Sequence, residues 1–392
     1  MNNQQTGWAA HATLLIATML VVVGSICASE GLQTGKPGET FSLGGKTVTI
    51  KRIVMLPVVE NVYAAAHTFE PFADLKLAEF RTKNKLDDVV RAGTDEFDQQ
   101  VRLLDWVHKR FKKFGTPTSK ANNPAAILQA VDEGQTFFCA HYGTVLVGAA
   151  QCLGWPARVL GLKRPDNLGE RSTEHTVTEI WSNQYGKWIL FDPTYAVYME
   201  KDGQPLNAWE MRQEWFYQDW GKHLTFVVHA TRDKHPVGDL PITLAVMAGY
   251  GTMELSKNTL YKYAFLAYQP ESKVFANGQG YGGMFITKDK LCDGTKWHTR
   301  QNPADPANDP YFPLNQADLS MMPGNGLDLH VSIKTMTPSF KTFQKRVDGK
   351  DWADCGNTLT WTMHPGANVL EVRSVNALGV VGHVSTVELD VK

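Results

Sequence analysis

The 392-residue sequence has few cysteines, and none of them is spaced for a structural metal site. The five are Cys27, Cys139, Cys152, Cys292 and Cys355, and no two form a CxxC pair. Cys139 and Cys152 fall 13 residues apart in one predicted helix, which puts them roughly 20 Å apart and excludes a disulfide between them. Cys292 and Cys355 could form a disulfide in an oxidising compartment. Cys139 and Cys152 then remain as thiols, and each needs its own explanation.

The sequence also lacks an excess of charge of either sign. Its 39 Lys and Arg residues nearly balance 40 Asp and Glu residues, which gives a net charge of −1. The longest basic stretch is the short run 109–113, typical of the solvated end of a helix. Nucleic-acid binding is therefore disfavoured, because no basic surface is indicated.

Long apolar runs are scarce except near the N-terminus. Residues 13–23 are apolar and are followed by small residues up to Ala28. The length suits the core of a secretory signal and is short for a membrane span, although no Lys or Arg precedes it. We expect residues 1–28 to be a signal peptide, with a membrane anchor or a buried helix as alternatives. The protein is then secreted, periplasmic or at the cell surface, and the bulky Ile26 argues against a lipoprotein Cys27.

Several catalytic motifs are absent as well. There is no H-E-x-x-H, Walker A or G-x-S-x-G sequence. Residues 278–283 fit G-x-G-x-x-G, but a strand-like segment follows instead of the helix that phosphate binding requires. We therefore expect neither a cofactor nor a metal.

Apolar periodicity predicts three helices in the middle of the chain. Thr94–Asp95 should cap a helix that runs to about Lys113, because apolar residues recur there at steps of three and four. Pro124 opens a short second helix. The third runs from Cys139 to Leu153 and is closed by Gly154.

Strand-like runs surround and follow the third helix. Three come directly after it: 157–162, 175–181 and 187–191. A helix packed on antiparallel strands is an α+β core. Later runs, divided by glycine and proline, predict an all-β sandwich; they are 261–268, 283–287, 327–335, 358–363, 368–373 and 385–391.

These patterns predict a division of the chain into five parts. The parts are the signal or anchor 1–28, an N-terminal extension 29–95, the α+β core 96–225, a connector 226–256 and the β-sandwich 257–392. The sandwich is loosely similar to immunoglobulin or fibronectin modules.

Three residues of the α+β core could perform acyl transfer. Cys139 lies where a loop enters a helix, and the partial positive charge of a helix N-terminus favours a thiolate. His175 begins one strand and Asp192 ends the next, so the acid could orient the base. Cys152 is expected to be buried packing.

The same residues carry a family resemblance. The segments GQTFFCAHYGTVLVGAAQCLGWPARVL, EHTVTEIW and GKWILFDPTYA resemble the three signature blocks of the transglutaminase-like superfamily. The matching positions are Cys139, Gly154–Arg158, His175, Trp188 and Asp192–Thr194. The resemblance covers residues 96–198 and implies a papain-like core with a Cys139–His175–Asp192 triad. By analogy with papain-like enzymes, Gln135, four residues before Cys139, is a candidate for the oxyanion hole; the alternative is an ordinary loop residue. Many members have an aromatic residue where this chain has Val177.

The resemblance implies an exported cysteine enzyme that acts on amide or peptide carbonyls through a thioester. Its substrate would be a protein or peptide, including cell-wall or extracellular material. Hydrolysis by a protease or amidase is slightly favoured over protein-glutamine transamidation. The alternatives are an inactive binding or scaffold protein on the same fold and a protein whose β-domain binds the ligand that matters.

Overall fold

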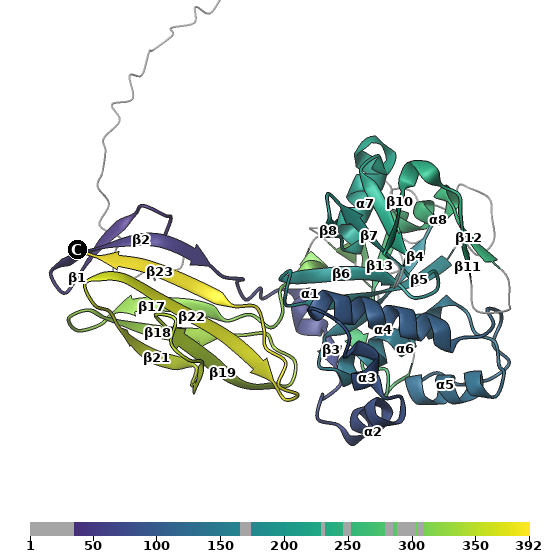
Figure 1. Cartoon of the computed structure of the whole chain (residues 1–392), viewed down its shortest axis with the longest axis horizontal. Coiled ribbons are helices and arrows are strands. Elements are labelled where there is room, and N and C mark those ends of the chain that lie inside the picture. Colours follow the sequence, from purple (N-terminus) through teal and green to yellow (C-terminus); the bar gives the residue numbers. More distant parts are fainter. Residues whose placement is uncertain are drawn as a thin grey trace, which may run out of the picture.

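The computed structural model describes residues 35–164, 174–228, 232–245, 252–278, 285–287, 303–304 and 309–392. These residues form an α+β part and a β-sandwich, which lie side by side along the long axis of the molecule (Figure 1). No helix in these ranges is long and apolar enough to cross a membrane. The predicted signal or anchor lies outside the described residues, as do Cys27 and Cys292.

A large, mostly antiparallel sheet organises the α+β part. Its strands follow the order β10-β9-β7-β6-β5-β4-β13-β15-β16, and β8 pairs with β7. Their bounds are β4 Ala157–Lys163, β5 Glu174–Ser182, β6 Lys187–Asp192, β7 Val197–Lys201, β8 Gln204–Pro205, β9 Leu224–Val228, β10 Asp233–Pro236, β13 Phe265–Tyr268, β15 Phe285–Thr287 and β16 Pro303–Ala304. The three strands predicted after the Cys139 helix are β4, β5 and β6, which are adjacent in the sheet.

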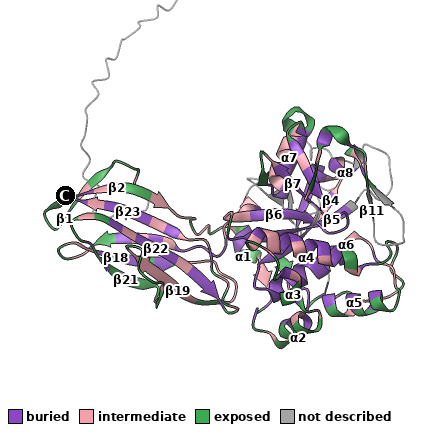
Figure 2. Cartoon of the chain, viewed as in Figure 1, coloured by how far each residue is buried: buried purple, intermediate pink, exposed green. Residues whose placement is uncertain are grey.

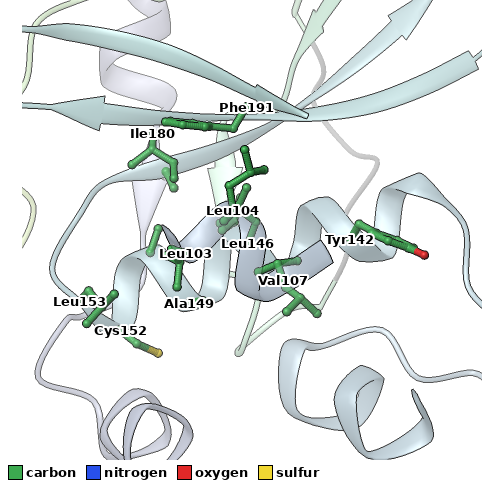
Figure 3. Close-up of a cluster of buried hydrophobic side chains, with 14 of the residues drawn as sticks. Leu103, Leu104, Val107, Tyr142, Leu146, Ala149, Cys152, Leu153, Ile180 and Phe191 are labelled. Atoms are coloured by element: carbon green, nitrogen blue, oxygen red, sulfur yellow. The ribbon is translucent and has the colours of Figure 1, made fainter. Parts of the chain in front are cut away.

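The three predicted helices are present: α4 (Glu96–Arg110), α5 (Pro124–Asp132) and α6 (Cys139–Cys152). The α6 helix packs on this sheet as expected, with α4 beside it and α5 packed on α6. The Asp95 and Asn123 side chains cap α4 and α5 by accepting backbone N–H groups. In Figure 3 the side chains of α4 and α6 pack against Ile180 of β5 and Phe191 of β6. The buried apolar faces of α4 and α6 thus fix α6 beneath the two strands that carry His175 and Asp192.

The remaining short elements complete the α+β part. Their bounds are α1 Val62–Ala66, β3 Thr68–Phe69, α2 Leu75–Lys83, α3 Leu86–Val90, α7 Ala208–Tyr217, β11 Ile242–Ala245, β12 Thr252–Leu255, α8 Lys257–Tyr261, β14 Glu271–Ser272 and the 3-10 turns η3 Asp219–Gly221, η4 Val237–Asp239, η5 Lys262–Ala264 and η6 Asp309–Tyr311. At the centre of the sheet, Arg158 forms a fully buried ion pair with Glu179 at 2.6 Å. This is the structural role expected for an arginine that is paired and shielded from water.

The β-sandwich is built from both ends of the described chain. One sheet has the order β1-β2-β23-β22-β19-β20 and the other β17-β18-β21. Their bounds are β1 Thr40–Leu43, β2 Lys46–Val54, β17 Asp318–Pro323, β18 Asp328–Lys334, β19 Phe340–Val347, β20 Ala353–Cys355, β21 Thr358–Thr362, β22 Gly366–Asn376 and β23 Ser385–Val391. Figure 2 shows buried and more exposed residues alternating along these strands, because one face of each sheet covers the shared core.

Two expected boundaries differ from the observed sheets. Strand β2, placed by the sequence in an N-terminal extension, pairs with β23 of the sandwich. Strand β13, expected in the sandwich, pairs with β4 of the α+β sheet. Local patterns show that a segment is extended but not which distant strand completes its hydrogen bonds.

The expected connector 226–256 also contains paired strands. It includes most of β9 and all of β10, β11 and β12. Each of these strands has four or five residues, too few for the alternation of apolar and polar residues to stand out between prolines and glycines.

The two parts meet at the turn between β5 and β6. The His383 ring Nδ1 donates to the carbonyl of Asn183 at 3.2 Å, and Asn315 donates to the Asn183 side-chain oxygen at 3.0 Å. Asn376 donates to the carbonyl of Gly154 at 2.8 Å. The sandwich therefore contacts the end of the β5–β6 hairpin opposite to His175 and Asp192.

Candidate active site

Cys139 occupies the first position of α6, as predicted. Phe138 precedes it as the N-cap and offers no side-chain hydrogen bond. Cys139 is partly exposed, whereas the residues that follow it in α6 are buried. The helix N-terminus places backbone N–H groups and partial positive charge at this partly exposed residue.

His175 and Asp192 are in direct contact. The His175 Nε2 and Asp192 Oδ2 atoms are 2.7 Å apart, and both side chains are buried. Since Nε2 faces the carboxylate, Nδ1 is the nitrogen left for the Cys139 thiol, which is hydrogen-bonded to His175. The structure therefore brings the three residues together in the order thiol, imidazole, carboxylate.

Asp192 is itself held in place by the backbone after it. Its other oxygen, Oδ1, accepts N–H groups from Thr194 at 3.0 Å and Tyr195 at 3.3 Å. The Tyr195 ring lies edge-on to the His175 ring, with centroids 5.6 Å apart. The Asp-Pro-Thr-Tyr turn thus fixes the acid and also packs against the base.

The surroundings of Cys139 favour the thiolate. Burial alone raises the pKa of its thiol, but the hydrogen bond and charge of His175, with hydrogen bonds from Thr176, lower this pKa below its ordinary value. A nearby cation and hydrogen-bond donors stabilise the charged sulfur more than burial destabilises it.

His175 is shifted in the opposite direction. Burial lowers its pKa, but the charge and hydrogen bond of Asp192, with contributions from Cys139, raise this pKa to about 9. A lowered thiol pKa beside a raised imidazole pKa favours a thiolate–imidazolium pair over the pair of neutral groups. The arrangement can supply both a nucleophile and a proton donor.

Gln135 does not contact Cys139 in any described interaction. Its side-chain oxygen accepts a hydrogen bond from the Thr118 hydroxyl, and its backbone N–H bonds the carbonyl of Ala130 at 3.0 Å. Its contribution to an oxyanion hole stays a prediction.

Cys152 lies at the other end of α6 and is buried, as expected. Burial raises the pKa of its thiol. His141, two residues after Cys139, is buried, and its ring contacts the rings of Phe137 and Phe138. Burial lowers the pKa of His141 to about 4, so it packs as a neutral ring.

Sequence reasoning missed two neighbours of the thiol. Thr176 hydrogen-bonds the Cys139 sulfur, and its place directly after His175 was the available signal. Lys262 in η5 lies within electrostatic reach of Cys139 and Asp192. Burial lowers the pKa of Lys262, and the opposing effect of these two groups is smaller. Lys262 is 70 residues beyond Asp192, and no local pattern marked it.

Known proteins provide a family match for this region. The model of the transglutaminase-like superfamily matches residues 83–193, which include Cys139, His175 and Asp192. A comparison with curated proteins finds no significant match. Among solved structures, a candidate cysteine protease from Cytophaga hutchinsonii is 14% identical, with a TM-score of 0.26. The match covers 38% of this chain and 49% of that protein, so this chain spans about half of its length. The family match identifies residues 83–193 as a transglutaminase-like domain.

Proposed function

We propose that this protein is a cysteine enzyme that cleaves amide or peptide bonds through a covalent thioester. The observation that carries the proposal is the contact series from the Cys139 thiol to His175 and from His175 Nε2 to Asp192 Oδ2 at 2.7 Å. A nucleophile, a base and a group that orients the base are the three requirements of this chemistry.

In the first half of the reaction, the Cys139 thiolate attacks the carbonyl carbon of the amide. The tetrahedral oxyanion would form beside the N-terminus of α6, where the N–H of Cys139 is directed. The His175 imidazolium then gives its proton to the leaving nitrogen, the C–N bond breaks, and ammonia or an amine departs. A thioester on Cys139 remains.

In the second half, neutral His175 removes a proton from the attacking group as that group adds to the thioester. The C–S bond breaks and the thiolate is restored beside the imidazolium. Asp192 keeps His175 in the tautomer that presents Nδ1 to the sulfur throughout, because its carboxylate accepts the Nε2 proton.

The acceptor of the acyl group decides between two activities. Water gives an amidase or peptidase, and a primary amine gives a transamidase. We favour hydrolysis slightly, since prokaryotic-looking members of the family that this domain resembles are often hydrolases. Measuring ammonia release with and without an added primary amine on a glutamine-bearing protein separates the two, because only transamidation incorporates the amine.

The decisive experiment compares the native chain with Cys139→Ala and with Cys152→Ala as a matched control on the same helix. We expect Cys139→Ala to lose ammonia release and amine incorporation, and Cys152→Ala to keep both. Equal signals from the native and Cys139→Ala proteins would refute an enzyme of this type and favour a binding or scaffold role.

We also propose that the protein is exported and acts on protein or peptide substrates outside the cytoplasm, including cell-wall material. The support is the apolar run 13–23 followed by small residues up to Ala28. Sequencing the N-terminus of the protein recovered from its native compartment tests this. A mature N-terminus near residue 28 supports export by cleavage, and an intact Met1 in the cytoplasm contradicts it.

A further inference from the structure

We propose that Thr176 stabilises the Cys139 thiolate with two hydrogen bonds, one from its backbone N–H and one from its hydroxyl. The inference rests on the proposed function, because it assigns a task to a residue of the same site. Both groups lower the pKa of the Cys139 thiol, and both belong to the residue that directly follows the proposed base.

The direction of the Thr176 N–H follows from strand geometry. The N–H of Trp181 on β5 donates toward β4, to the carbonyl of Pro156 at 2.8 Å. Successive N–H groups of a strand point to opposite sides, so those of residues 176, 178 and 180 point toward β6. Pairing of β5 with β6 reaches only as far as Thr178 opposite Phe191.

The next residue that would pair with Thr176 in this register is Pro193. The chain turns there, and the Pro193 carbonyl accepts a hydrogen bond from His108 Nδ1 at 3.2 Å. The carbonyl that would continue the ladder is therefore engaged elsewhere, and a proline has no N–H to offer. The end of the ladder leaves the Thr176 N–H available to the sulfur.

The side chain of Thr176 is directed toward α6. A Cβ built on Gly143, one turn after Cys139, would lie 3.3 Å from Thr176 Cγ2. The methyl group of Thr176 thus packs on the helix face that begins with Cys139. With its methyl group held against Gly143, the branched side chain has little freedom, and its hydroxyl is available to the sulfur.

Thr178 provides an internal comparison. It lies two residues further along the same face of β5, and its hydroxyl donates to the carbonyl of Gly143 at 3.4 Å instead of to the sulfur. It is fully buried. The two threonines share their strand, their face and their helix, and they differ in whether the hydroxyl reaches Cys139.

The test measures how the rate of Cys139 alkylation by iodoacetamide depends on pH, followed by mass spectrometry of the Cys139 peptide in the full chain. Thr176→Val removes the hydroxyl while keeping the branched shape. We expect it to slow alkylation roughly tenfold at pH values below the native inflection, since a hydrogen bond to a charged group is lost. Thr176→Ser keeps the hydroxyl and should react like the native chain.

Thr178→Val is the matched control, and its profile should equal that of the native chain. An unchanged profile for Thr176→Val overturns the inference, and so does an equal slowing by Thr178→Val, which would indicate a general loosening of β5 on α6. If Thr176→Val does not fold, a slow Thr176→Ser protein overturns the inference and a native-like one supports it.

Failure of the proposed function has a different signature. In that case Cys139 of the native chain itself alkylates like an ordinary thiol, with an inflection no lower than that of a free cysteine. If the alkylation profile of the native chain has a low inflection and Thr176→Val does not change it, only the proposed role of Thr176 is refuted.

Discussion

The two ends of helix α6 carry the same residue type in opposite circumstances. Cys139 begins the helix, is partly exposed and touches His175, while Cys152 ends the helix within the hydrophobic core. The pKa of the first thiol is lowered and that of the second is raised. Reactivity is therefore set by position along the helix and by neighbours, and one α6 serves both chemistry and packing.

The contrast has identifiable causes at each end. At the start of α6, partial positive charge, the imidazolium and the Thr176 donors favour the anion. At its end, burial raises the Cys152 pKa, and the opposing effect of Arg81 is smaller. A buried thiol without a cationic hydrogen-bond partner behaves as a small apolar side chain.

The largest effect should come from Asp192→Asn, which disturbs the His175 ring that makes Cys139 differ from Cys152. Asp192 Oδ1 accepts two backbone N–H groups, so an asparagine would keep its oxygen there and turn its NH2 toward His175. His175 would then lose its partner for the Nε2 proton, and kcat/KM should fall about 10⁴-fold. Steady-state kinetics on the substrate found for the native chain measure this; native activity in the variant would contradict the role of Asp192.

The contrast between the two thiols can be measured directly in the native chain. Near neutral pH, Cys139 should react with iodoacetamide at least about a thousandfold faster than Cys152, since both thiolate fraction and access differ. Mass spectrometry of the two peptides gives the ratio, and unfolding in denaturant should bring it close to one. Equal slow alkylation rates of the two thiols in the folded protein would contradict the predicted difference between Cys139 and Cys152.

The dependence of kcat/KM on pH should show the pH range in which Cys139 is an active nucleophile. As pH falls through the lowered Cys139 pKa, the sulfur gains a proton and activity declines about tenfold per unit. As pH rises through about 9, His175 loses the proton needed by the leaving nitrogen, and activity declines again. A profile of kcat/KM that is flat from weakly acidic pH to well above 9 would contradict the paired titration.

The smallest effect is expected for Cys152, at the buried end of α6. Cys152→Ala should lower the free energy of unfolding by about 1 kcal/mol, because it leaves a small cavity in the core. Denaturant unfolding measures this change, and kcat should stay at its native value. A large loss of activity in a variant of native stability would show that Cys152 takes part in the reaction.

Much of the core was predictable because its signals are local. The cap at Asp95, the opening Pro124 and the closing Gly154 placed α4, α5 and α6 within a few residues of their observed bounds. The order of Cys139, His175 and Asp192 gave the candidate site, because each lies at the start or end of an element.

The long-range pairings were not predictable from these patterns. Neither the partnership of β2 with β23 nor that of β13 with β4 leaves a mark in the local sequence. The position of Lys262 near Cys139 depends on β13 reaching the sheet. Such placements depend on the register between distant strands, which one sequence does not reveal.

Because the sandwich joins β2 to β23, the chain passes between the two parts twice, once after β2 and once before β17. Val58 in the first passage donates its N–H to Asp318 at the start of β17 at 2.9 Å, which ties the two passages together. Two connections between the parts permit bending at the junction but restrict rotation of one part about the other. A protease that cut one passage would leave two pieces still held together by the ladder between β2 and β23.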